Sequence, residues 1–68
     1  MNYTVEYEQE EDGRWLAEVM ELPGVIAYGQ TREEAIARVE ALSLRVLAER
    51  LENGETQGRV FSVSFAAA

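Results

Sequence analysis

Three glutamates in the N-terminal part of the chain are spaced so that their carboxylates could act together in catalysis or metal binding: Glu6, Glu8 and Glu18. The alternating pattern around them places all three on one face of a strand pair. Clustered carboxylates can hold Mg²⁺ for phosphodiester cleavage. A nuclease also needs basic groups for its substrate, and a solvated strand face is the simpler interpretation. We therefore expect these acids to face a binding partner, with a metal-dependent nuclease as the alternative.

Other kinds of catalysis lack their usual residues. The chain has no Cys, no His and no Lys, so disulfides and the usual zinc sites are excluded. Its serines and threonines have no ordinary general base. The segment LPGVIAYGQT has two glycines before a predicted helix, but it matches neither a dinucleotide fingerprint nor a phosphate loop. We expect a protein that is not an enzyme and holds neither cofactor nor metal.

The charge is strongly acidic, with a formal net charge of −7 at pH 7. This disfavours binding to nucleic acid or to anionic membranes. It favours a basic protein partner attracted by electrostatic steering, although it could also serve only solubility. The sequence has neither a long apolar run nor a signal-peptide pattern at its N-terminus. We expect a cytoplasmic protein.

Two alternating runs, residues 2–9 and 15–20, predict strands with their aromatic residues facing the core. Asp12 and Gly13 between them predict a hairpin, because both positions tolerate positive φ. Arg14 is a predicted cross-strand partner of the acids, as is Arg59. Pro23 and Gly24 break the second strand, and residues 25–28 predict a short third strand.

A long helix is predicted over residues 32–52. Thr31 and Glu34 form a capping-box pattern, and Asn53-Gly54 is a natural helix end. Ion pairs are expected between Glu34 and Arg38 and between Arg45 and Glu49. The predicted core face of the helix comprises Ala35, Ile36, Val39, Leu42, Val46 and Leu47. Residues 59–65, which include alternating Phe61, Val63 and Phe65, predict the last strand, and the three final alanines are expected to fray.

These elements predict one domain, residues 1–68, of the α+β class. Its order is β-β-β-α-β, with one helix packed on one face of a small, mostly antiparallel sheet. Leu44, Ala48 and Leu51 fall on a flank of the helix beside the core face. So small a chain gains stability by association, so we expect a homo-oligomer, a dimer or tetramer, with this flank or the exposed strand edges as contacts. Alternatively, the twist of the sheet covers the flank, or its residues are singly exposed.

The ordered set of motifs D-G-x-W-x-A-x-V, L-P-G and G-x-T-x-E-E-A resembles the HicB-like antitoxin family. In this chain they read EEDGRWLAEVMELPG and AYGQTREEAIARVEALSL, after an initial Y-x-V-x-Y-E. The resemblance covers Tyr3 to about Leu47. It implies a partial ribonuclease H-like fold and a role in a type II toxin–antitoxin system. That role is to bind and mask a small basic toxin ribonuclease (HicA-like).

The sequence departs from the family pattern in two places. The usual V-P-x-L-P-G reads here as Val19-Met20-Glu21-Leu22-Pro23-Gly24, without the first proline. Family members usually carry a C-terminal segment that binds operator DNA, and this chain ends after the predicted last strand. Direct DNA binding is therefore not expected. A small oligomeric scaffold or binding protein without a toxin partner is the remaining alternative.

Overall fold

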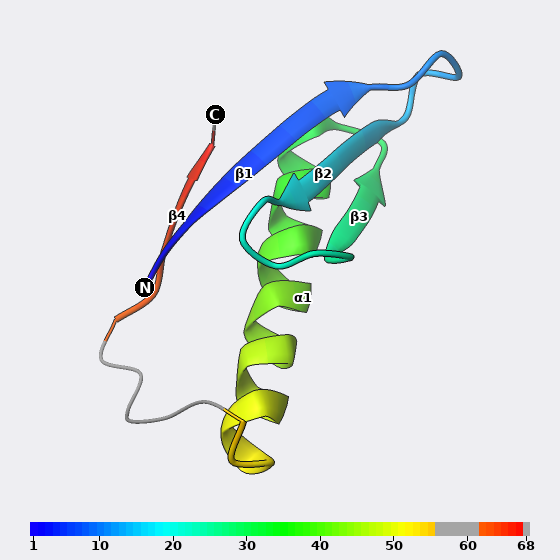
Figure 1. The fold of residues 1–68 in the computed structure, drawn as a ribbon. Coiled ribbons are helices and arrows are strands. Elements are labelled where there is room, and N and C mark those ends of the chain that lie inside the picture. The colour runs from blue at the N-terminus through cyan, green and yellow to red at the C-terminus, as the bar shows by residue number, and fades with distance from the viewer. Residues whose placement is uncertain (56–61, 68) are drawn as a thin grey trace.

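The computed structural model describes residues 1–55 and 62–67 and shows a small α+β fold (Figure 1). The elements are β1 (Asn2–Gln9), β2 (Trp15–Val19), β3 (Ile26–Gly29), α1 (Arg32–Glu52) and β4 (Ser64–Ala67). The sheet has the order β3-β2-β1-β4. β2 is antiparallel to both of its neighbours, whereas β4 is parallel to β1, so the sheet is mixed. The predicted class and the predicted β-β-β-α-β order are confirmed.

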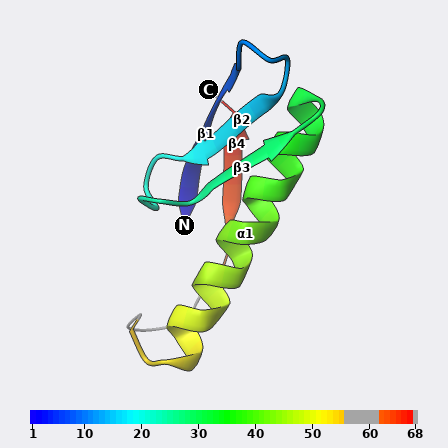
Figure 2. The same ribbon diagram turned by 90° about the vertical axis from the view of Figure 1, so that its right-hand side faces the viewer.

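The core lies between α1 and one face of the sheet (Figure 2). Successive side chains of a strand point to opposite faces, so the odd-numbered residues of β1 and β2 face the helix. Val5, Ala17 and Val19 are buried there against Ala35 and Val39 of α1. No helix of the described residues lies on the opposite face of the sheet, which is called the outer face below.

The capping pattern at Thr31 starts the helix where the sequence predicted it. The Thr31 hydroxyl accepts a hydrogen bond of 3.1 Å from the Glu34 N–H. The Glu34 carboxylate in turn accepts one of 2.9 Å from the N–H of Gln30, the residue before the cap. At the other end the Asn53 N–H donates to the Glu49 carbonyl, and Gly54 has a φ of +70°. The predicted bounds 32–52 are confirmed.

The buried stripe of α1 includes one polar residue that the sequence pattern did not single out. Ser43 is fully buried, and its hydroxyl donates to the Val39 carbonyl at 2.7 Å. This bond to the preceding turn satisfies the hydroxyl inside the core. The predicted ion pair of Glu34 with Arg38 forms at 3.4 Å. Arg45 and Glu49, both within the described chain, do not approach within 4.0 Å, so that prediction is wrong.

The hairpin between β1 and β2 is longer than a two-residue turn. The Glu10 N–H donates to the Arg14 carbonyl at 2.7 Å, and the Gly13 N–H donates to the Glu10 carbonyl at 3.0 Å. Three residues therefore form the loop, with Gly13 in the left-handed region at a φ of +92°. Asp12 does not have a positive φ, so only Gly13 uses the conformation that both residues tolerate, and the predicted hairpin is confirmed. A three-residue loop of this kind is a common hairpin solution.

β4 begins later than predicted. Its register pairs Ser64 with Asn2 and Ala67 with Val5. Met1 fixes this register, because its amino group donates to the Ser62 carbonyl at 2.8 Å and its carbonyl accepts from the Ser64 N–H at 2.9 Å. The strand therefore takes in Ala66 and Ala67, contrary to the expectation that they fray. The first part of the predicted strand, 59–61 with Arg59 and Phe61, lies outside the described residues.

Candidate partner-binding surface

The three glutamates singled out from the sequence meet on the outer face of the sheet. The strand register places Glu6 directly opposite Glu18 and Glu8 opposite Leu16. Together with Leu16 and Tyr7, they line a shallow open depression of about 120 Å³. The sequence pattern thus predicted the shared face, and the structure adds the direct pairing of Glu6 with Glu18. We call Glu6, Glu8 and Glu18 the acidic cluster.

Glu6 and Glu18 form a like-charged cross-strand pair. Carboxylates directly opposite each other in an antiparallel sheet cost some stability, on the order of 0.2–1 kcal/mol. Within residues 1–55 and 62–67, no Arg lies within 4.0 Å of any member of the acidic cluster. The pair is therefore held in the fold without a compensating cation from the described chain.

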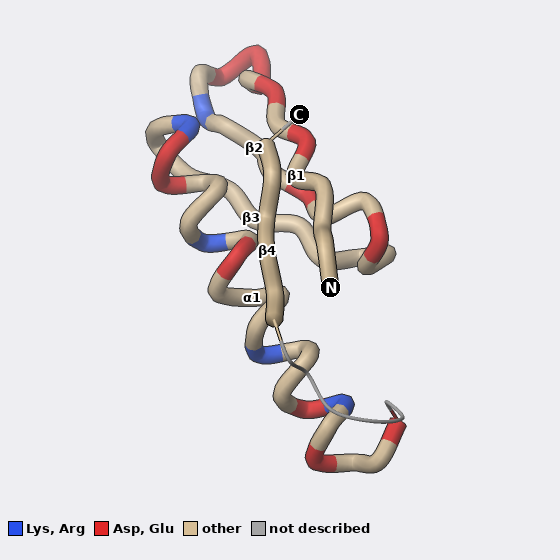
Figure 3. Tube along the Cα trace, turned by 90° about the vertical axis from the view of Figure 1, so that its left-hand side faces the viewer, with Lys and Arg blue, Asp and Glu red and all other residues tan. Residues whose placement is uncertain are grey.

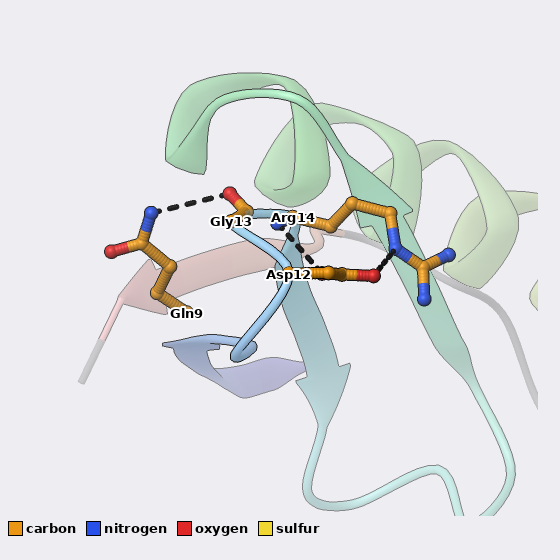
Figure 4. Close-up of polar contacts among 4 residues, drawn as sticks. All are labelled: Gln9, Asp12, Gly13 and Arg14. Carbon is orange, nitrogen blue, oxygen red and sulfur yellow. Dashed lines mark hydrogen bonds and ion pairs between the residues drawn. The ribbon is translucent and has the colours of Figure 1, made fainter.

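Arg14 does not pair with the acidic cluster, contrary to the prediction. Its backbone N–H donates to Asp12 Oδ1 at 3.0 Å, and its Nε donates to Oδ2 at 2.8 Å (Figure 4). Its guanidinium lies over the Tyr28 ring, 4.8 Å from the centroid. The bond from the Arg14 backbone N–H lowers the pKa of Asp12 below its ordinary value. Arg14 therefore contacts the hairpin loop and β3 rather than the acidic cluster.

The carboxylates of the outer face are not arranged as a metal site. Over the described part of the chain, no group of three or more Asp, Glu, His or Cys side chains converges closely enough to hold an ion. Glu6, Glu8 and Glu18 share a face and a depression, but they do not converge on one point. The arrangement suits contact with an extended cationic surface better than the chelation of one cation.

Apolar side chains adjoin the acidic cluster on β2 and β3. Ile26 lies opposite Glu18, and Tyr28 lies opposite Leu16. Ile26 and Tyr28 are each 42 % exposed, and Met20 at the end of β2 is 48 % exposed. We call Leu16, Met20, Ile26 and Tyr28 the apolar strip. The sequence did not lead us to expect Ile26 and Tyr28 on this face, although the alternation of residues 26–29 is the signal that could have placed them there.

The Glu21 carboxylate, in the turn that follows β2, binds to β1. Glu21 accepts two hydrogen bonds from Thr4, one of 2.8 Å from the backbone N–H and one of 2.9 Å from the hydroxyl. The bond from the Thr4 N–H lowers the pKa of Glu21 below its ordinary value. Glu21 thereby ties the turn after β2 back onto β1.

The helix flank predicted as an oligomer contact lies away from the outer face. Leu44 is 50 % exposed, Leu51 is 40 % exposed, and Ala48 is also exposed. The alternative that the sheet covers this flank is therefore wrong. Its role in association stays a prediction.

Comparisons of the chain with protein-family models, with curated proteins and with solved structures find no match. The resemblance to the HicB-like family therefore stays a hypothesis based on the residues quoted above. Of the helical segments that the structure describes, none is long and apolar enough to cross a membrane.

Proposed function

We propose that this chain is an antitoxin-like protein that binds and masks a small basic ribonuclease through the outer face of its sheet. The observation that carries the proposal is the facing pair Glu6 and Glu18, held without a cation within 4.0 Å from the described chain. A basic partner would supply that cation and relieve the repulsion. Binding would then remove the repulsion between Glu6 and Glu18 that destabilises the free protein.

The two parts of the outer face would serve different purposes. The acidic cluster would draw in the partner and set its orientation, because charge complementarity acts mainly on association rate and specificity. The apolar strip would supply affinity, because Ile26, Tyr28 and Met20 would lose their exposure to water on binding. A ribonuclease binds RNA through basic groups that contact phosphates. Carboxylates placed on those groups would compete with the phosphates and block the substrate.

The test is a binding and inhibition assay with the product of any small basic reading frame found next to the one that encodes this chain. We expect a complex that weakens as ionic strength rises, because surface charge attraction is screened by salt. Ribonuclease activity should fall in step with complex formation. The double variant Glu6→Gln/Glu18→Gln should raise the dissociation constant by about tenfold or more, equivalent to roughly 1.4 kcal/mol.

Glu49 and Glu52 give a matched control, because both are exposed on α1 away from the outer face. The variant Glu49→Gln/Glu52→Gln removes the same net charge and should bind nearly as well as the unaltered protein. Equal losses in both double variants would show that only net charge matters and would contradict the assignment to the outer face. The absence of any complex at low salt would contradict the proposed function itself.

A further inference from the structure

The two edges of the sheet differ in how their outward backbone groups are used. β3 and β4 are the edge strands. Exposed edges can pair with a strand of another chain unless something blocks them. On β3, the Val19 N–H bonds the Val25 carbonyl, so the alternation of an antiparallel pair directs the Tyr28 carbonyl away from β2. Arg38 Nη1 donates to that carbonyl at 3.0 Å, so α1 itself blocks this edge.

The β4 edge has no such block among the described residues. The Ser62 carbonyl and the Ser64 N–H both bond Met1, so the even-numbered residues direct their backbone groups toward β1. The alternation of a strand then directs the N–H and C=O groups of Val63, Phe65 and Ala67 outward. Ala67 is exposed, and Val63 and Phe65 are half-buried. This edge therefore offers a row of donors and acceptors that no group within residues 1–55 and 62–67 is shown to bond.

The β4 edge is also free of charge in a strongly acidic protein. Residues 62–67 contain no Asp, Glu or Arg, whereas the whole chain has a net charge of −7. Figure 3 looks onto this edge and shows β4 uncharged along its length, with acidic residues on β1 and at the hairpin. Two copies of so acidic a chain repel each other over most of their surface. A second copy meets the least electrostatic repulsion when it approaches along this uncharged edge.

We infer that β4 is the site of self-association, pairing antiparallel with β4 of a second copy across a twofold axis. A symmetric contact requires the two identical strands to run in opposite directions. Placing Phe65 opposite the second copy's Phe65 lets Val63, Phe65 and Ala67 of each chain all form backbone hydrogen bonds. The result is a continuous sheet through both copies, with both helices on the same face.

Side chains strengthen this register on the helix-side face. Phe65 already stacks on Tyr3, with ring centroids 5.7 Å apart. Facing Phe65 residues would extend this pair into a row of aromatic rings across the junction. Aromatic cross-strand pairs contribute beyond the backbone bonds. The interface leaves the outer face free, so it is compatible with the proposed function but does not depend on it.

The test combines sedimentation velocity with amide hydrogen exchange on the full chain. We expect a dimer at tens of micromolar, together with exchange at Phe65 and Ala67 that slows as protein concentration rises. The variant Ala67→Pro removes an outward N–H that β1 does not use, and it should shift the protein to monomer. The variant Leu44→Gln/Leu51→Gln alters the helix flank and should leave the dimer intact.

Three results would overturn the inference. One is a wild-type protein that stays monomeric with exchange at Phe65 and Ala67 independent of concentration. Another is a dimer abolished by Leu44→Gln/Leu51→Gln but kept by Ala67→Pro. The third is protection of these amides only when a basic partner is added, which would assign the edge to that partner. Concentration-dependent exchange in the unaltered protein decides the question even where Ala67→Pro fails to fold.

Discussion

The α-carbon of Gly29 lies so close to α1 that an added Cβ atom would sit 2.6 Å from the backbone nitrogen of Ala35. The same atom would lie 3.0 Å from the Glu34 carbonyl carbon. Both neighbours belong to the first turn of the helix, whose backbone is fixed by the cap at Thr31. Gly29 therefore sets the distance between the end of β3 and the start of α1.

Replacing this glycine with alanine should push the helix away from the sheet. We expect Gly29→Ala to lower the free energy of unfolding by about 1–3 kcal/mol, as overpacking does elsewhere. Chemical denaturation measures the change. Gly13→Asn is the comparison, because a Cβ there meets nothing within 4 Å and the cost comes only from the positive φ, which Asn tolerates better than most residues; it should lower stability by less than Gly29→Ala does. Equal effects at both positions would show that the contact with Ala35 is not limiting.

The acidic cluster should oppose stability while it serves binding. We expect Glu6→Gln/Glu18→Gln to raise the free energy of unfolding by about 0.2–1 kcal/mol at low salt, because it removes the facing like charges. The gain should shrink as salt is added. Thermal or denaturant unfolding with increasing salt tests this. Unchanged or lower stability at low salt would mean that the two carboxylates do not repel each other in the free protein.

The sequence located the helix and the acidic face well because both depend on local patterns. Thr31 with Glu34 fixed the start of α1, and simple alternation placed Glu6, Glu8 and Glu18 on one side. The direct pairing of Glu6 with Glu18 was not predictable, because it depends on the length of the hairpin loop. A two-residue turn would have given another register, and only the bond pattern around Gly13 decides between them.

Long-range choices account for the other differences. Alternation in the C-terminal segment indicated a strand, but it could not show which residues of the segment pair with β1. The bonds of Met1 to Ser62 and Ser64 determine that register. The sequence also could not show that Arg14 prefers Asp12, two residues away, to the glutamates across the hairpin. The sequence did not predict that Ser43 is buried, because the core face of α1 was identified from apolar residues alone and serine is polar.

The carboxylate of Glu21 should make stability depend on pH. Its bonds from Thr4 lower its pKa in the folded state below the ordinary value of 4.5. A lowered folded pKa stabilises the protein above the unfolded pKa, and this stability is lost as pH falls through the folded pKa. Glu21→Gln should therefore destabilise the protein at about pH 7 and have a smaller effect near about pH 3. Denaturant unfolding of both proteins across this range measures the difference, and a difference that does not vary with pH would contradict the linkage.

The cap at Thr31 should control how firmly α1 is held against β3. Thr31→Ala removes the acceptor for the Glu34 N–H and should lower the free energy of unfolding by about 1 kcal/mol. Thr31→Ser keeps the hydroxyl and should restore most of the loss. Amide exchange of Glu34 provides a local measurement, because its protection should fall in the alanine variant and persist in the serine variant. Loss of protection in both variants would indicate that the methyl group of Thr31, rather than its hydroxyl, stabilises the start of the helix.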